Sequence, residues 1–488
     1  MKNLRLYRAC FLLLIIPIII GISSGTLFAL TRTIELDQIE KVRLLGPNNN
    51  LVKVLLVLNS SQNLDFVVGL VKIIDKIHRT DKLSGKDAFK LHIVPSSLDQ
   101  KNDCKALRDK VSATLIQKYV EFNKGFATSD IWMQDWGEIG MFKIKGQPKP
   151  QLAIIDSNRG RGIGELPKLL SHFWSSYYIK NPANRLSAGD YGGNIEITPD
   201  DVLIIGDTSS TELRNLLGKL GYKSRMVVVE TDWLNVGHCD EYLSVAPNKT
   251  SPNGYSIIKA DTRLALRLLL DTPEEDLKKI PVPEYRKKML EIHAFLQKNR
   301  ALLQPQRSVS TTEDFSTVKI NLRKAEIPSA NEINFALVLG DKDKNDPIKA
   351  FIETNLALDT IINSNIEQVI KTINKVNGER GKKLSVISYP NLYHKIGSGN
   401  KHIAYHPGVV NQLILRGHLI IPDPMITSFK NYITKVTKKV GLTPHFLNDM
   451  MYHELQGEIH CGTNVFRHPN RYFVKSKNLP QIWRDWEK

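Results

Sequence analysis

The chain has 488 residues, with 67 lysines and arginines against 50 aspartates and glutamates, so its formal net charge is +17. This length is enough for one large domain or two to three smaller ones with a generous core. The basic residues are scattered, without an arginine-rich arm, a zinc-finger signature or an RNA-binding signature. The composition therefore argues against a nucleic-acid partner and favours a solvated basic surface.

The N-terminus has the layout of an export signal. Lys2, Arg5 and Arg8 precede an uncharged run of 22 residues, 9–30, as in a leader with a positive region followed by an apolar core. The run is also long enough to span a bilayer, and Leu27 stands where a small residue is preferred before cleavage after Ala29. Residues 1–30 are therefore predicted to be a signal peptide or an N-terminal membrane anchor, with the rest of the chain secreted or outside the membrane.

Strand and helix patterns alternate along the chain. Strands are expected at residues 51–58, 91–95, 152–155, 202–205, 226–229, 255–259, 336–339 and 384–387. Helices are expected at residues 64–77, 105–119, 165–177, 210–220, 263–270 and 348–373. This alternation without a glycine-rich phosphate loop indicates an α/β fold that does not bind a nucleotide. A charged stretch and a polar connector at about 271–316 are predicted to be a helical insertion within one domain.

The cysteines favour a thiol enzyme over a disulfide framework. Outside the leader the chain holds Cys104, Cys239 and Cys461, and an odd number leaves at least one thiol free. The best candidate nucleophile is Cys461, because residues 457–460 are predicted to be a strand and Gly462 allows a sharp turn after the thiol. A small buried side chain is the alternative for an isolated cysteine.

Two other stretches carry groups that could share a site with this thiol. Residues 130–135 contain an aromatic, an amide and two acids, and His238 and Asp240 stand two apart. In an extended segment residues at this spacing point to the same side, so both could face one pocket while Cys239 faces away. Isolated aspartates and histidines are more often caps or core residues, so the argument depends on their occurring together.

Five ordered segments resemble the catalytic domain of the protein-arginine deiminases. They are residues 130–140 (DIWMQDWGEIG), 156–162 (DSNRGRG), 192–199 (GGNIEITP), 231–244 (TDWLNVGHCDEYLS) and 446–465, which ends in HCGTNV. The resemblance spans about residues 40–488. It implies a single catalytic domain with the pentein fold, the five-bladed α/β propeller of the guanidino-group-modifying superfamily.

The resemblance also implies a reaction. Asp135 and Asp240 match the family's two guanidinium-binding acids, Cys461 its nucleophile and His238 its acid and base. The expected activity is hydrolytic deimination of arginine in proteins to citrulline and ammonia through a covalent thiouronium on Cys461. A planar guanidinium suits such a site because carboxylates can bind its N–H groups in pairs.

Substrate contacts carry over less completely. Trp132 matches an aromatic wall along the methylene stem of the arginine, and Arg161 matches an arginine that holds the substrate backbone. Two further arginines of the family are replaced here by Ile131 and Leu455. The preference for particular peptides is therefore left open.

Calcium is the cofactor that the resemblance implies. One site would use the side chains of Gln134, Glu138 and Glu196 with main-chain carbonyls near Gly192 and Ile195, all hard oxygen ligands. A second site retains Asp156 and Ser157, but Trp136 and Gly160 stand where the family has an acid and an amide. One calcium site is expected to be intact and the second degraded.

Other functions compete with protein deimination. An enzyme of the same fold could act on a small free guanidine such as agmatine or arginine. The motifs at residues 460–464 (HCGTN) and 132–135 (WMQD) argue against that alternative, and the two replaced arginines favour it mildly. The chain could also be a non-catalytic, calcium-dependent binding protein, although no catalytic position is substituted. The expected partners are arginine-containing proteins or peptides.

Overall fold

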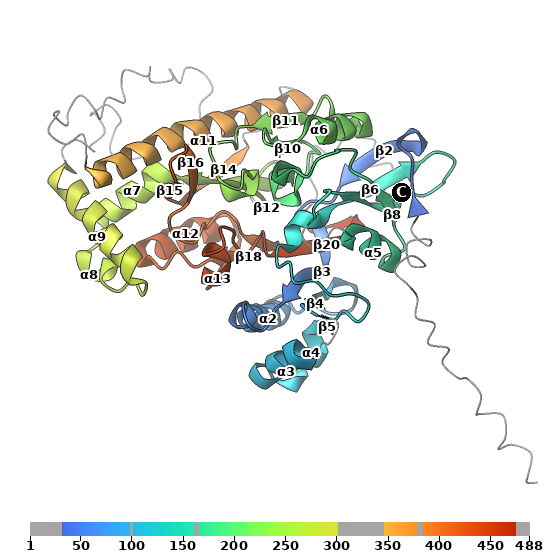
Figure 1. The fold of residues 1–488 in the computed structure, drawn as a ribbon, viewed down its shortest axis with the longest axis horizontal. Helices are drawn as coiled ribbons and strands as arrows, with labels where there is room; N and C mark the ends of the chain where they lie inside the picture. Colours follow the sequence, from blue (N-terminus) through green and yellow to red (C-terminus); the bar gives the residue numbers. More distant parts are fainter. Residues whose placement is uncertain (1–31, 98–100, 161–164, 301–345, 378–383, 475–488) are drawn as a thin grey trace, which may run out of the picture.

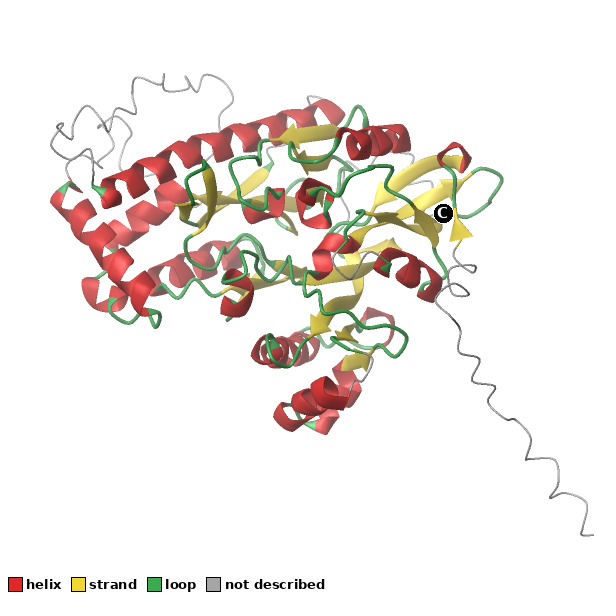
Figure 2. Ribbon diagram, in the orientation of Figure 1, coloured by secondary structure: helices red, strands yellow, loops and turns green. Residues whose placement is uncertain are grey.

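The structure is a computed structural model, and it describes residues 32–97, 101–160, 165–300, 346–377 and 384–474. Short sheets alternate with helices along the chain (Figure 1), and Figure 2 shows helices flanking the sheets. The predicted α/β class is therefore confirmed. The expected strand at 336–339, the leader and Arg161 lie outside the described residues. None of the described helices is both long and apolar enough to cross a bilayer.

One arrangement of strands and helix recurs in the described part of the chain. Strand β9 (Ile195–Ile197) pairs antiparallel with β10 (Leu203–Gly206), helix α6 (Thr211–Leu217) follows, and β11 (Met226–Val229) returns parallel to β10. A helical crossover is what a parallel return requires. Five of the six sheets contain this unit.

The other four units have the same order of strand, antiparallel strand, helix and parallel strand. One unit consists of β6 (Gly137–Ile144), β7 (Gln151–Asp156), α5 (Leu166–Phe173) and β8 (Tyr177–Ile179), and the next of β12 (Leu243–Pro247), β13 (Tyr255–Asp261), α7 (Thr262–Asp271) and β14 (Ser385–Pro390). A further unit consists of β17 (Leu413–Leu415), β18 (His418–Pro422), α12 (Thr427–Lys439) and β19 (Thr443–Leu447). The last consists of β20 (Thr463–Tyr472), β3 (Asn49–Leu58), α2 (Leu64–Thr80) and β4 (Lys90–Pro95). In the last unit a C-terminal strand pairs with an N-terminal one.

Additional strands extend this scheme. Strands β1 (Arg32–Thr33) and β2 (Ile39–Leu44) form the two edges of the sheet of β6, and β5 (Val120–Phe122) extends the sheet of β4. Strands β15 (Tyr393–Ile396) and β16 (Lys401–Ala404) form a separate hairpin. The inner strands read as continuous apolar runs because helices and neighbouring sheets cover both faces. Residues 54–58 of β3, for example, are fully buried.

The predicted helix at 105–119 is wrong as a single element. It is two helices, α3 (Lys101–Lys110) and α4 (Ala113–Tyr119). The break occurs at Ser112, whose side chain accepts a hydrogen bond of 3.4 Å from the main-chain N–H of Leu115. A serine in that position starts a new helix, because its hydroxyl replaces a carbonyl that the first turn lacks.

The predicted helical insertion lies between β13 and β14. After α7 the chain forms α8 (Glu274–Leu277) and α9 (Pro283–Lys298), and after residues outside the described part it forms α11 (Pro347–Asn377). Helix α11 buries a stripe at helical spacing that includes Ile362, Ile366, Val369 and Ile373. This stripe packs on the core beneath β11 and β13, so the insertion is attached to the sheets through an amphipathic face.

A buried arginine joins the last strand to two other segments. Arg467 of β20 donates hydrogen bonds to the carbonyl oxygens of Pro47 (3.3 Å), Asn49 (3.1 Å) and Ile414 (2.9 Å). Burial lowers the pKa of this guanidinium to about 10. The group is therefore still charged at neutral pH, and its hydrogen bonds satisfy three carbonyls around it.

We expect the substitution Arg467→Met to lower the free energy of unfolding by about 3 kcal/mol or more, because it leaves buried carbonyls without donors. Urea unfolding followed by tryptophan fluorescence measures the change. The control is Arg79→Met, which removes the ion pair of the exposed Arg79 with the partly buried Asp75 (2.7 Å) and should change the free energy by less than about 1 kcal/mol. Equal effects of the two substitutions would contradict the role given to Arg467.

Candidate active site

The predicted site residues lie just before the first strands of the repeated units. The one-turn helix η3 (Met133–Trp136) precedes β6, η5 (Gly192–Asn194) precedes β9, and η7 (Cys239–Glu241) precedes β12. The turn with Cys461 precedes β20 in the same way, and Asn411 precedes β17. Equivalent ends of all five units thus carry the site, although they are far apart in sequence.

Main-chain and side-chain hydrogen bonds hold these segments together. The N–H of Gln134 donates to the carbonyl oxygen of Cys461 (3.1 Å), which joins η3 to the cysteine turn. The N–H of Cys239 donates to Oδ1 of Asn194 (3.1 Å), which joins η7 to η5. The side chain of Asn411 both accepts from the N–H of Cys461 (3.2 Å) and donates to its Sγ (3.2 Å). The thiol is therefore fixed by a partner on a separate unit.

The local conformation around Cys461 differs from the prediction. Residues 457–460 do not form a strand, because the chain turns through 459–462 and β20 begins at Thr463. The glycine is nevertheless required. A methyl group at Gly462 would lie 2.5 Å from the ring of Tyr452. The turn is closed by a hydrogen bond of 2.8 Å from the hydroxyl of Thr463 to the carbonyl of Ile459.

Asp240 is the acid that contacts the thiol. Its Oδ2 lies 3.8 Å from Sγ of Cys461 and accepts a hydrogen bond of 2.8 Å from Nδ1 of His460. The other oxygen, Oδ1, is buried and has no hydrogen-bond partner among the described residues. Burial lowers the pKa of His460, but the hydrogen bond and charge of Asp240 outweigh burial and raise it above its usual value.

Asp135 has the same arrangement with a different cation. Its Oδ2 accepts a hydrogen bond of 2.8 Å from Nη1 of Arg159, and its Oδ1 is buried without a partner in the described part of the chain. The same guanidinium donates to Asp130 through Nε (3.1 Å) and Nη2 (3.3 Å), and it lies 4.5 Å from the centre of the Tyr191 ring. The side chain of Arg159 is only 2% exposed.

His238 presents one free ring nitrogen to the same place. Its Nε2 donates to the carbonyl oxygen of Ala188 (2.8 Å), and its Nδ1 is buried without a partner in the described residues. A methyl group at Gly193 would lie 2.6 Å from this Nδ1 and 3.0 Å from Oδ2 of Asp240. Both side chains therefore face the backbone of η5.

The prediction that His238 and Asp240 lie on an extended segment is wrong. Residues 239–241 form a helical turn instead of an extended segment, so the two-residue alternation does not apply to them. Cys239 is fully buried, and its Sγ lies 3.8 Å from the carbonyl of Gly193. Burial raises the pKa of this thiol well above its usual value.

The pKa values of the site residues are shifted by burial and by neighbouring charges. Burial, and then the charges of Asp240 and Asp135, raise the pKa of the Cys461 thiol well above its usual value. Burial likewise raises the pKa of Asp135, although the positive charges of His238 and Arg159 oppose it. The site without a ligand thus holds a protonated thiol and an excess of acid groups.

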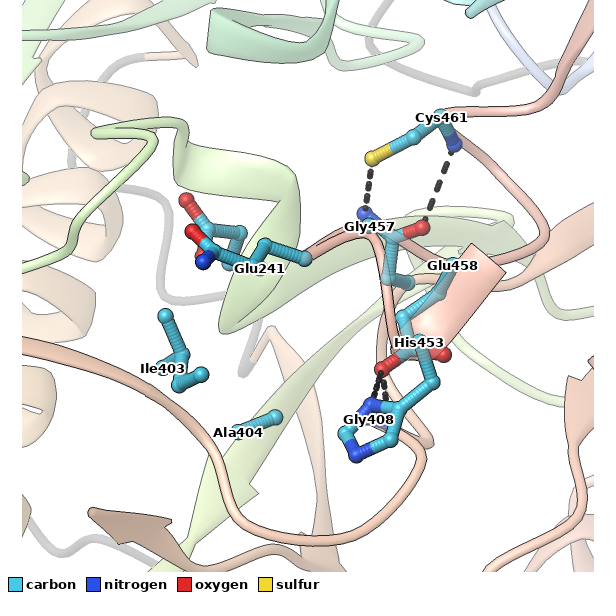
Figure 3. Close-up of a pocket in the computed structure, with 10 residues that line it drawn as sticks. Glu241, Ile403, Ala404, Gly408, His453, Gly457, Glu458 and Cys461 are labelled. Atoms are coloured by element: carbon cyan, nitrogen blue, oxygen red, sulfur yellow. Dashed lines mark hydrogen bonds and ion pairs between the residues drawn. The ribbon is translucent and has the colours of Figure 1, made fainter. Parts of the chain in front are cut away.

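Two hollows adjoin the cysteine turn. Figure 3 shows Cys461 on the wall of a cavity that Glu241, His453 and Glu458 also line, with Glu458 accepting hydrogen bonds of 2.7 Å from both His453 and the N–H of Gly408.

The second hollow, of about 310 Å³, is more open and lies on the side of Trp132. Ile131 and Leu455, at positions where the resemblance predicts arginines, line it with Trp132. Leu455 is 52% exposed. The ring of Trp132 also packs against Gly457, which lies just before the cysteine turn. Trp132 therefore lies between the hollow and the turn that carries the thiol.

Three of the residues predicted to bind calcium, Gln134, Glu138 and Gly192, lie close together. A methyl group at Gly192 would lie 2.3 Å from the carbonyl of Gln134 and 2.8 Å from Oε1 of Glu138. That Oε1 is buried and lacks a partner among the described residues. Burial and the charge of Glu196 raise the pKa of Glu138 well above its usual value, and burial raises the pKa of Glu196 to about 7. Ile195 follows as the first residue of β9.

The residues of the second predicted calcium site have other partners. Asp156 accepts hydrogen bonds from the hydroxyl of Tyr178 (2.5 Å) and the N–H of Asn158 (2.8 Å). Ser157 donates to the carbonyl of Asp135 (2.5 Å). Trp136 is fully buried beside them. In the described ranges no three His, Cys, Asp or Glu side chains converge as a metal-binding group.

The sequence alone does not predict three residues of the site. Arg159 lies within the segment 156–162, but the resemblance assigns a role only to Arg161, two positions later. His460 is adjacent to the nucleophile, and no sequence pattern predicts its contact with Asp240. Asn411 belongs to none of the five segments, and its contact with Sγ of Cys461 becomes visible only in three dimensions.

Comparisons with known proteins agree with these motifs. The sequence model of the protein-arginine deiminase family matches residues 89–473. Human protein-arginine deiminase type-4 is 26% identical over 367 residues, and human type-3 is 27% identical over 375 residues. Each match covers 70% of this chain and 47% of the relative, so the chain matches less than half the length of those proteins.

Among solved structures, agmatine deiminase of C. jejuni has a TM-score of 0.45 at 11% identity, covering 88% of this chain and 96% of that protein. The family model covers residues 130–244 and 446–465, which contain the motifs of the site, and extends over most of the chain. The chain therefore belongs to the protein-arginine deiminase family.

Proposed function

We propose that the protein hydrolyses the guanidinium group of arginine residues in proteins, giving citrulline and ammonia. The observation that carries this proposal is a set of three buried polar atoms without partners in the described residues: Oδ1 of Asp135, Oδ1 of Asp240 and Nδ1 of His238. Buried polar atoms are seldom left without a hydrogen bond. A guanidinium supplies N–H donors to both acids at once.

The electrostatics of the site support a cationic substrate. The negative charges that raise the pKa of Cys461 are the charges that a bound guanidinium would neutralise. Binding therefore lowers the pKa of the thiol and favours the thiolate, which is the nucleophilic form. In this proposal the substrate activates the nucleophile that attacks it.

The reaction follows from these positions in two steps. The thiolate of Cys461 forms a bond to the central guanidinium carbon, and His238 donates a proton to the leaving nitrogen as the C–N bond breaks, releasing ammonia. The neutral His238 then takes a proton from water, whose oxygen attacks the thiouronium carbon. The C–S bond then breaks as the hydroxyl proton of the adduct passes to solvent, where the released ammonia takes it up as ammonium, and the thiolate and the ureido group of citrulline remain.

The hollow beside Trp132 supports a polypeptide as the substrate. It is open to solvent, lies next to the residue expected to flank the arginine stem, and is large enough for residues on either side of the target arginine. Arg161, expected to hold the peptide backbone, lies outside the described residues. Ile131 and Leu455, at positions where the resemblance predicts arginines, give this rim apolar side chains in place of positive charges.

We propose that calcium binds Gln134, Glu138 and Glu196 with carbonyls near Gly192 and Ile195. The unpartnered Oε1 of Glu138 and the raised pKa values of both glutamates support a cation there, and the oxygens match the preference of calcium. Bound calcium would neutralise these acids and hold η3 against η5. The competing hydrogen bonds of Asp156 and Ser157 support the view that the second site is degraded.

We propose that the five repeated units are the blades of a five-bladed propeller. Two features support this arrangement: the segments before the first strands of all five units meet at the site, and pairing of β20 with β3 links the two ends of the chain.

Residues 1–30 would direct this domain outside the cell or hold it at the membrane surface. Export would place it where calcium is abundant.

We expect purified protein to convert an arginyl peptide to the citrullyl peptide, measured by mass spectrometry, with agmatine and free arginine turned over poorly. Cys461→Ser should lower kcat by at least about 10³-fold, and Asp240→Asn should lower kcat/KM by at least about 10²-fold. Cys104→Ser is the control, because Cys104 is buried on α3 and belongs to no part of the site. Full ureido formation by the Cys461→Ser variant would refute the proposal. Faster turnover of agmatine than of the arginyl peptide would show that the substrate is a small free guanidine instead of arginine in proteins.

Calcium binding should weaken as the pH falls. Because the pKa of Glu196 is about 7, lowering the pH below this value protonates the carboxyl group, and calcium must then displace a proton. We expect the dissociation constant from calorimetry to be at least about tenfold higher at pH 6 than at pH 8. Glu196→Gln should bind more weakly and lose much of this pH dependence. Equal calcium affinity in the variant and the parent protein would exclude Glu196 as a ligand.

A further inference from the structure

We propose that Arg159 and His460 are a pair of positioning residues, each of which holds one oxygen of a substrate-binding acid so that the other oxygen is presented to the substrate. The inference rests on the proposed function, because it treats Asp135 and Asp240 as the guanidinium-binding acids. It adds two residues that do not themselves bond to the substrate and assigns each of them a partner.

The two acids are held in the same way on different units of the fold. Oδ2 of Asp135 accepts from Nη1 of Arg159 at 2.8 Å, and Oδ2 of Asp240 accepts from Nδ1 of His460 at 2.8 Å. In both acids Oδ1 is the buried oxygen without a partner in the described residues. This correspondence between two unrelated segments indicates a common requirement for orientation.

Arg159 is itself fixed on three sides. Asp130 binds it through two nitrogens, at 3.1 and 3.3 Å, and the ring of Tyr191 covers its guanidinium. A fork held in this way keeps one N–H directed at Asp135. Because the anchor on Asp130 leaves little freedom of rotation, the Asp135 carboxylate is oriented before the substrate arrives.

His460 has the equivalent task for Asp240. It is adjacent to Cys461 in sequence, so the turn that places the nucleophile also places the donor to Asp240. The thiol of Cys461 lies 3.8 Å from the same Oδ2. A donor on Oδ2 thus fixes the acid and leaves Oδ1 as its buried oxygen without a partner in the described residues.

These cations also adjust the charge of the site. Asp130, Asp135 and Asp240 contribute up to three negative charges, and the positive charges of Arg159 and a protonated His460 offset part of them. Preorganised groups of this kind strengthen binding because less reorganisation accompanies it.

The test measures substrate binding apart from turnover. Binding of an arginyl peptide is measured by calorimetry in the Cys461→Ala background, and kcat and KM are measured with Cys461 present. Arg159→Gln and His460→Ala should each raise the dissociation constant by at least about tenfold, with KM raised more than kcat is lowered. His460→Asn, which keeps a donor near the position of Nδ1, and Arg159→Lys, which keeps the charge, should recover part of the loss.

The matched control is Arg225→Gln, which removes a partly buried arginine that pairs with a buried aspartate, Asp201, at 2.6 Å. It should lower the melting temperature while leaving peptide binding within about twofold. If Arg159→Gln and His460→Ala also lower only the melting temperature, and peptide binding is unchanged, the two residues are structural and the inference is wrong. If binding follows the predicted order but the parent protein turns over no arginyl compound, the inference stands and the proposed reaction fails.

Discussion

Two buried carboxylates that each keep one oxygen without a partner, next to a buried thiol, are the constraint on which the rest of the structure depends. Oδ1 of Asp135 and of Asp240 lack hydrogen-bond donors within the described residues, which is unfavourable in a dry environment. Burial, and then the same charges, raise the pKa of the Cys461 thiol. A cation placed between the acids would correct both conditions at once, and this coupling links recognition of the substrate to activation of the nucleophile.

The fold produces this arrangement by repetition. Each of the five strand–strand–helix–strand units begins just after a segment of the site, so short turns from residues 133–136, 192–194, 239–241, 411 and 461 meet at one place. Each of these turns leads into a strand with a buried face, and the packed strand holds the turn rigidly in place. Hydrogen bonds between the turns, such as the one from Gln134 to the carbonyl of Cys461, then fix their relative positions.

Much of this could be predicted from the sequence, but for different reasons in different parts. Strong periodicity identified the long helices and inner strands, and motif resemblance identified Cys461, His238, Asp135 and Asp240. Local conformation was less predictable. Residues 457–460 alternate like a strand, but the chain turns through residues 459–462 and strand β20 begins only at Thr463.

Partners that are distant in sequence could not be inferred. Arg159 and Asp135 are 24 residues apart, and Asn411 and Cys461 are 50 apart. No local pattern predicts which arginine among many will pair with which acid, since tertiary packing decides it. The unpartnered atoms of Asp135, Asp240 and His238 are equally a property of the folded chain.

The most direct measurement is the mass of the cysteine-containing peptides after the enzyme is quenched with acid during turnover of an arginyl peptide and digested. The account predicts an adduct on Cys461 equal to the substrate less ammonia, because the thiouronium forms as ammonia leaves. An adduct on Cys104 or Cys239, or citrulline formed without any adduct in conditions that trap thiouronium on a known thiol, would contradict it.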